Sequence, residues 1–69
     1  MLELDLHGIR HIDVDRIVEN FIFLNALPLY IITGNSMKML EITMEVLGRN
    51  NFEYVIGNEW NKGYIKVLK

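Results

Sequence analysis

The stretch "LELDLHG", residues 2–8, decides how the layers of this protein are arranged. Leucine alternates with Glu3, Asp5 and His7, so a strand here places apolar side chains on one face and polar side chains on the other. A strand that is covered by helices on both faces is apolar throughout. The alternation therefore predicts a sheet with helices on one face only, and an open face that carries Glu3, Asp5 and His7.

Apolar residues spaced three and four apart predict two helices. The first covers about residues 11–25, and its predicted buried face holds Val14, Ile17, Val18, Phe21 and Leu24. The second begins after Asn35 or Ser36, either of which can cap it, and ends near "GRNN" at 48–51. Its predicted buried face holds Met37, Leu40, Met44 and Leu47, and we interpret the methionines at 37, 39 and 44 as core filler.

Three further stretches have the patterns of strands: "LYIIT" at 29–33, "FEYVIG" at 52–57 and "YIKVLK" at 64–69. The last two flank a polar loop, "NEWNK" at 58–62. The predicted order is βαβαββ within one domain, residues 1–69, and right-handed crossovers favour parallel pairing of the first two strands. We predict an α/β fold, more closely an α+β two-layer sandwich, with a mixed four-stranded sheet and two helices on one face.

Composition and charge restrict the classes of function. The chain has no cysteine, so disulfides, thiolate metal sites and cysteine nucleophiles are excluded. The chain has seven basic and nine acidic residues, which argues against strong nonspecific binding of nucleic acid. This composition is still compatible with a local basic patch. No apolar run is long enough for a membrane span, and no basic segment precedes the first strand. We therefore expect a soluble cytoplasmic protein that has no membrane partner.

Asp5 and His7 are the strongest candidates for chemistry. Two residues apart on a strand, they emerge on the same face near its carboxyl end, where α/β sheets usually bind ligands. A carboxylate can fix the tautomer of a neighbouring imidazole and raise its basicity, which makes a general base or a pair of metal ligands. The alternative is an ordinary polar strand face, in which His7 closes the turn and Asp5 pairs with Lys66.

A second candidate is the "TGNS" stretch, residues 33–36, between the second strand and the second helix. Gly34 permits close approach of a ligand to the backbone, and free N–H groups at the start of a helix attract anions. The alternative is a plain turn followed by a helix cap. If the first two strands are parallel, this turn and the "HG" turn at 7–8 lie at the same edge of the sheet, which favours a joint site.

Other residues are weaker candidates. Arg10 and His11 are predicted to point towards this edge and to form a small basic cluster with Lys38, although Lys38 also fits a solvated helix face. Trp60 could stack on a base, but we expect it to fold back over its hairpin. Asp5 and His7 alone supply too few ligands for a metal site to be predicted, so a divalent metal cofactor is left open.

The order of these motifs resembles the Smr (small MutS-related) domain family. The resemblance rests on "LDLHG" at 4–8, a helix, "IITG" at 31–34, a second helix and a closing hairpin, and it covers essentially the whole chain. Ser36 and Lys38 stand where that family commonly has glycine, and Glu41 where it commonly has lysine or arginine. The resemblance implies a sandwich similar to the C-terminal domain of bacterial initiation factor three, nucleic-acid binding, and endonuclease activity in several members.

The resemblance assigns the family's aspartate and histidine to Asp5 and His7, and its turn to Thr33 and Gly34. We therefore expect a nucleic-acid-binding domain, with DNA or RNA cleavage as a further activity in which Asp5 orients His7 as base or acid. The residues predicted to hold the phosphate are Gly8, Arg10, Thr33, Gly34, Asn35, Ser36 and Lys38. The alternatives are a non-catalytic module that binds nucleic acid or protein at the same edge, and a protein-interaction module built on strand edges and Trp60. A separate protein that supplies targeting is a further expected partner.

Overall fold

Four strands and two helices follow one another in the predicted order. The computed structural model describes residues 2–69. The elements are β1 (Glu3–Asp5), α1 (His11–Leu24), β2 (Leu29–Ile32), α2 (Met37–Arg49), β3 (Tyr54–Ile56) and β4 (Tyr64–Val67). The predicted βαβαββ order is confirmed, and the elements end within one to three residues of the predicted limits.

The strands form one mixed sheet in the order β1-β2-β4-β3. β1 runs parallel to β2, with Asp5 opposite Ile32. β4 is antiparallel to both of its neighbours, β2 and β3. Because β1 and β2 are parallel, their carboxyl ends meet at one edge, as the sequence analysis required for a joint site.

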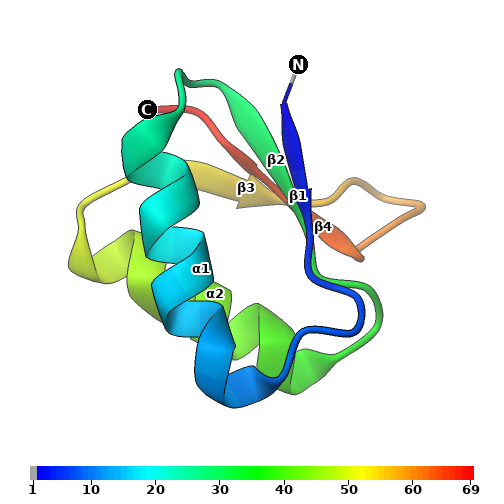
Figure 1. The fold of residues 1–69 in the computed structure, drawn as a ribbon. Helices are drawn as coiled ribbons and strands as arrows, with labels where there is room; N and C mark the ends of the chain where they lie inside the picture. Colours follow the sequence, from blue (N-terminus) through cyan, green and yellow to red (C-terminus); the bar gives the residue numbers. More distant parts are fainter. Residues whose placement is uncertain (1) are drawn as a thin grey trace.

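Both helices cover the same face of the sheet, so the molecule has two layers (Figure 1). The core between the layers is apolar and combines residues of both helices with those of the covered sheet face. Its fully buried members include Leu6, Val14, Val18, Leu29, Ile31, Val46, Leu47, Ile65 and Val67. Glu3 and Asp5 are exposed on the opposite face. The predicted single helical layer and open acidic face are confirmed.

Two details of the predicted helix faces are wrong. Met37 is 67% exposed, whereas Met39, two residues further on, is buried. Leu24 is 81% exposed, whereas Ile22, which the prediction omitted, is buried. Two residues correspond to about 200° around a helix, so each predicted face included one residue from the opposite side.

The buried stripe of α1 is Val14, Val18 and Ile22, and that of α2 is Met39, Thr43, Val46 and Leu47. The α1 residues are four apart, and the α2 residues are three and four apart, so each set lies on one face of its helix. Thr43 fits within the apolar stripe because its hydroxyl donates to the carbonyl of Met39 at 2.9 Å. In the described part of the chain, no helix has the length and apolar character needed to cross a bilayer.

Candidate functional site

The first turn of the chain is organised by the carboxylate of Asp5. β1 ends at Asp5, so His7 lies in the following turn and not on the strand. One carboxylate oxygen, Asp5 Oδ1, accepts a hydrogen bond from the backbone N–H of His7 at 2.9 Å and lies 2.7 Å from His7 Nδ1. Gly8 completes the turn with φ +80°, a conformation that glycine adopts without steric cost.

This contact determines which ring nitrogen of His7 is basic. A carboxylate only accepts hydrogen bonds, so Nδ1 carries the proton and Nε2 of the neutral ring has a free lone pair. The hydrogen bonds from the backbone and ring of His7 hold the pKa of Asp5 below its ordinary value. Both side chains are well exposed, 67% for His7 and 59% for Asp5, so the pair is accessible to a ligand.

The alternative pairing of Asp5 with Lys66 is not observed. Lys66 instead places Nζ 5.9 Å from the centre of the Tyr30 ring, on the open face of the sheet. The carboxylate of Asp5 contacts His7, and the two residues form a local unit at the carboxyl end of β1.

The two predicted turns meet at Gly34 and His7. Gly34 has φ +66°, and a Cβ placed on it would lie 2.7 Å from His7 Nε2. In Figure 1 the turn after β1 and the turn after β2 run side by side. The absence of a side chain at Gly34 therefore lets the His7 ring pack directly against the second turn, with Nε2 as the ring atom nearest to Gly34.

The second turn is held by a residue that the sequence analysis did not consider. The carbonyl of Gly63, just before β4, accepts from the backbone N–H groups of Thr33 and Gly34, both at 2.9 Å. Gly34 N–H is therefore engaged within the protein, and the phosphate contact predicted for it is not available in this arrangement. Thr33 is only 4% exposed, and its hydroxyl donates weakly to the Gly34 carbonyl at 3.4 Å, so its visible role is to shape the turn.

Ser36 is the cap of α2. Its Oγ accepts from the backbone N–H of Met39 at 3.1 Å, and its own backbone is extended. This satisfies one of the free donors at the start of the helix. The preceding Asn35 is exposed and stands at the tip of the turn.

A small pocket of about 150 Å³ opens at this turn. Its lining joins the predicted residues of the turn to the start of α2 and to one lysine from the loop before β4: Gly34, Asn35, Ser36, Met37, Leu40 and Lys62. Lys62 is a cation that the sequence analysis missed. The loop that carries Lys62 is held here by the hydrogen bonds from Thr33 and Gly34 to the carbonyl of Gly63, and no local sequence pattern predicts these bonds.

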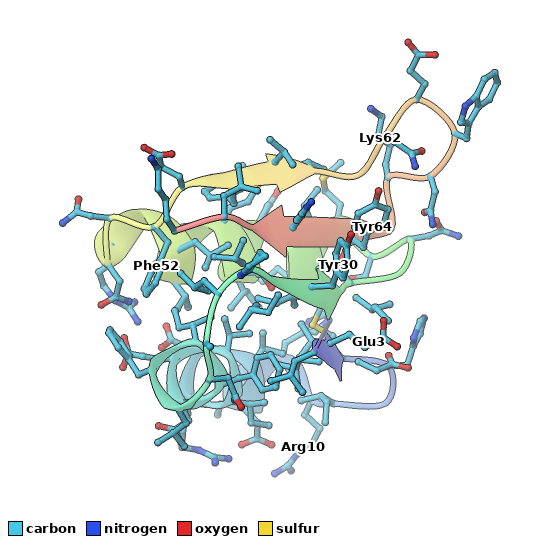
Figure 2. The ribbon with its side chains drawn as sticks, turned by 90° about the horizontal axis from the view of Figure 1, so that it is seen from above. Glu3, Arg10, Tyr30, Phe52, Lys62 and Tyr64 are labelled. Carbon is cyan, nitrogen blue, oxygen red and sulfur yellow. The ribbon has the colours of Figure 1, made fainter. Side chains whose placement is uncertain are left out.

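The predicted cations lie elsewhere. Arg10 Nε lies 3.3 Å from Asp13 Oδ2, within the first turn of α1, and its side chain is 81% exposed. Arg10 and Lys62 occupy opposite sides of the view in Figure 2. Lys38 is exposed in the first turn of α2 and does not line the pocket.

Trp60 does not fold back over its hairpin, and that expectation was wrong. Its side chain is 90% exposed. Asn58 Oδ1 accepts from the backbone N–H groups of Trp60 and Asn61, both at 2.8 Å, so the loop is stabilised by its own polar contacts and needs no indole packing.

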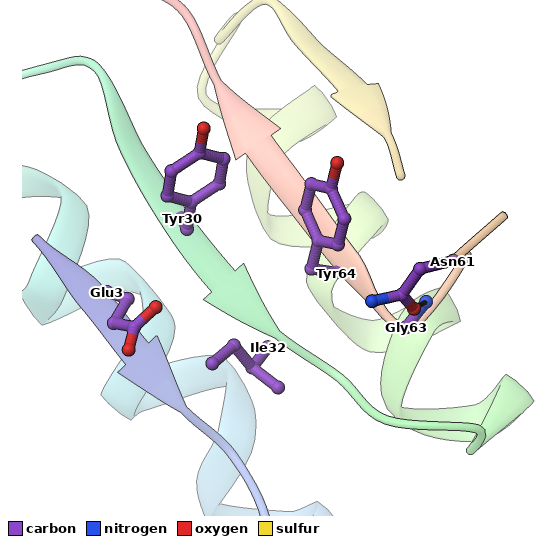
Figure 3. Close-up of a pocket in the computed structure, with 6 residues that line it drawn as sticks. All are labelled: Glu3, Tyr30, Ile32, Asn61, Gly63 and Tyr64. Carbon is purple, nitrogen blue, oxygen red and sulfur yellow. Dashed lines mark hydrogen bonds between the residues drawn. The ribbon is translucent and has the colours of Figure 1, made fainter. Parts of the chain in front are cut away.

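A larger groove of about 330 Å³ lies on the open face of the sheet (Figure 3). It is lined by Glu3, Tyr30, Ile32, Asn61, Gly63 and Tyr64. Tyr30 and Tyr64 meet edge to face, with ring centres 5.6 Å apart and an interplanar angle of 81°. The sequence predicts Tyr30 and Tyr64 on the open face or at its edge, as partial cover of the core and not as stacking platforms. That the two rings become neighbours depends on the pairing of β2 with β4.

The described residues contain no group of three or more histidine, cysteine or acidic side chains that could hold a metal ion. Comparison with models of protein families, with curated proteins and with solved structures found no match for this chain. The resemblance to the Smr family therefore rests on the motifs alone.

Proposed function

We propose that this protein binds nucleic acid at the edge where the turns after β1 and β2 meet, and cleaves a phosphodiester bond there with His7 as general base. The observation that carries the proposal is the position of His7 Nε2. Asp5 holds the other ring nitrogen at 2.7 Å, so in the neutral ring Nε2 is the nitrogen with the free lone pair, and it lies against Gly34 where the two turns meet.

In the proposed reaction, Nε2 removes a proton from an attacking water or hydroxyl group. The attacking oxygen forms a bond to phosphorus, the bond from phosphorus to the departing oxygen breaks, and the departing oxygen takes a proton from solvent. The Asp5 carboxylate stabilises the imidazolium that forms, as a fixed negative charge beside a developing positive one. General base catalysis of this kind contributes about 10²–10⁴-fold to a rate.

The pocket at the turn after β2, whose lining residue Gly34 packs against His7, supports the proposal as a place for the phosphate. Gly34, Asn35 and Ser36 line it, and Lys62 adds a positive charge within an acidic protein. Since the contribution of a lysine to phosphate binding is electrostatic, the affinity should fall steeply with salt. This dependence separates phosphate recognition from binding that relies on apolar contacts.

The test incubates the purified protein with labelled duplex DNA, single-stranded DNA and structured RNA, each with magnesium, manganese or EDTA. We expect cleavage by the wild type to fall at least about 100-fold in His7→Ala, because the general base is lost. Gel shifts at two salt concentrations should show that His7→Ala still binds. His11→Ala is the matched control, since His11 is the second histidine and is exposed at the start of α1.

Either of two outcomes contradicts the catalytic part. One is cleavage that survives in His7→Ala, which would place the reaction elsewhere or in a contaminant. The other is the absence of cleavage on every substrate, which with salt-sensitive gel shifts would leave a non-catalytic nucleic-acid-binding module. If binding is absent as well, the proposal fails as a whole.

A further inference from the structure

The groove on the open face has the size and chemistry of a site for a flat ligand. Its volume of about 330 Å³ lies within the range of about 300–1,000 Å³ that is usual for small-molecule sites, whereas the pocket at the turn after β2 is smaller. In Figure 3, Tyr30 and Ile32 project from β2, with Glu3 of β1 on one side of that strand and Tyr64 of β4 on the other. Apolar and aromatic surface thus surrounds a few polar groups, as in sites that stack a planar ring.

The polar groups of the groove are of two kinds. The carboxylate of Glu3 is an acceptor with two oxygens. The carbonyl oxygen of the Asn61 side chain accepts from the backbone N–H of Gly63 at 2.7 Å, which orients the amide and leaves its nitrogen as a donor. A ligand that fits both must present donors to Glu3 and an acceptor to Asn61.

A cationic ligand fits less well, although a carboxylate and two aromatic rings are the usual parts of a cation site. Lys66 already places its Nζ 5.9 Å from the centre of the Tyr30 ring. A second positive charge in the groove would be repelled by it. A neutral planar ligand avoids this repulsion.

We infer that the groove binds one unpaired nucleobase of a single-stranded nucleic acid, and that it prefers guanine. Guanine is the nucleobase whose pairing edge has two adjacent donors, N1–H and the N2 amino group, which match the two oxygens of Glu3. Its O6 and N7 are acceptors for the amide of Asn61. Adenine and cytosine present an acceptor next to their single amino group, and uracil presents one donor between two acceptors.

The groove and the Asp5–His7 pair are neighbours, and here the inference rests on the proposed function. Glu3 and Asp5 emerge on the same face of β1, about 7 Å apart along the strand. Gly63 lines the groove, and its carbonyl holds the turn in which Gly34 contacts His7. The base site and the proposed cleavage site are therefore connected through β1 and through Gly63.

The test is an NMR titration of the ¹⁵N-labelled protein with guanosine, adenosine, cytidine and uridine, none of which has a phosphate. We expect guanosine to shift the amide signals of Glu3, Ile32, Gly63 and Tyr64 at the lowest concentration. Glu3→Gln should weaken guanosine binding roughly tenfold, because one acceptor becomes a donor, and should reduce the preference over adenosine. Glu53→Gln, an exposed change outside the groove, is the matched control.

Equal binding of the four nucleosides, or shifts that survive unchanged in Glu3→Gln, would overturn the preference for guanine. Absence of any shift in these amides would overturn the site. Stronger shifts with methylguanidinium than with guanosine would identify a cation site, and would overturn the inference as well. Guanosine binding in His7→Ala separates the two proposals, because the groove does not need His7 whereas cleavage does.

Discussion

Gly34 determines how closely the two turns of the candidate site approach one another. A side chain there would require the left-handed conformation at φ +66° and would occupy space that begins 2.7 Å from His7 Nε2. Gly34 therefore provides the space that the imidazole ring of His7 occupies. Gly48 is different, since a Cβ added there would meet nothing within 4 Å and its φ is not positive.

Gly34→Ala and Gly48→Ala are expected to change stability in opposite directions. Alanine at position 34 should lower the free energy of unfolding by about 1–2 kcal/mol, because it must adopt the left-handed backbone conformation. Displacement of His7 by the new Cβ should lower it further. Alanine at 48, within α2, stabilises the protein by up to about 1 kcal/mol, because glycine is a poor helix former. Urea denaturation of both variants measures the difference, and equal effects would contradict the close contact at Gly34.

At the scale of elements, α2 is held at its start by a cap and at its end by ion pairs with α1. Arg49 donates two bonds to the carboxylate of Asp15, at 2.9 and 3.1 Å, and one to Glu19 at 3.1 Å. Asn50 adds a bond to the same Glu19 oxygen at 3.1 Å. These contacts connect the two helices near the end of α2, and Arg49 and Glu19 are 30 residues apart in the sequence.

Removing the cap in Ser36→Ala should lower the free energy of unfolding by about 1 kcal/mol, because the N–H of Met39 loses its acceptor. Ser36→Asp keeps a side-chain acceptor and should stay close to the wild type. Thermal or urea unfolding distinguishes the variants. A loss of stability in Ser36→Asp as large as that in Ser36→Ala would show that the cap is not what matters at this position.

Arg49→Met should destabilise the protein more than Arg16→Met does. Within residues 2–69, Arg16 pairs only with Asp13, one turn away in its own helix, at 3.3 Å, whereas Arg49 connects two helices. Since the groups involved are largely solvated, the effect of Arg49→Met should shrink as salt is raised. Urea unfolding at low and high salt tests this, and a salt-independent effect would instead point to packing of the arginine stem.

At the scale of the whole molecule, three ionised carboxylates connect stability to pH. Hydrogen bonds from His7 lower the pKa of Asp5, the contacts of Arg49 lower that of Asp15, and Asn50 together with Arg49 lowers that of Glu19. Because each pKa is lower in the folded state, the unfolded chain binds more protons in the acidic range. The stabilisation is therefore present above the ordinary values of about 4 and is lost as pH falls below them.

We expect the free energy of unfolding, measured in urea between pH 7 and pH 3, to decrease below about pH 4. Arg49→Met should make this decrease shallower, because Asp15 and Glu19 then lose the charged partner that lowers their pKa values. A stability that is constant from pH 5 to pH 3 would contradict the assignment of these contacts.

Much of the architecture follows from local patterns, and the errors have specific causes. The alternation of Glu3 and Asp5 with leucine predicted the open face because side-chain direction in a strand depends only on position. The same reasoning failed for Leu24 and Met37, since several neighbouring apolar residues in a helix are compatible with more than one buried face. Trp60 was misplaced because its loop is stabilised by Asn58, a polar arrangement that hydrophobicity does not reveal.

The sequence by itself determined the order of elements, the single helical layer and the turn at Gly8, and it restricted the cap of α2 to Asn35 or Ser36, because each depends on residues within a few positions of one another. Only the tertiary structure decided that Gly63 holds the turn at Gly34, that Lys62 reaches the pocket, and that Tyr30 and Tyr64 form one groove. These contacts depend on β4 pairing between β2 and β3. That pairing is selected by packing of the whole core, and no short stretch of the chain encodes it.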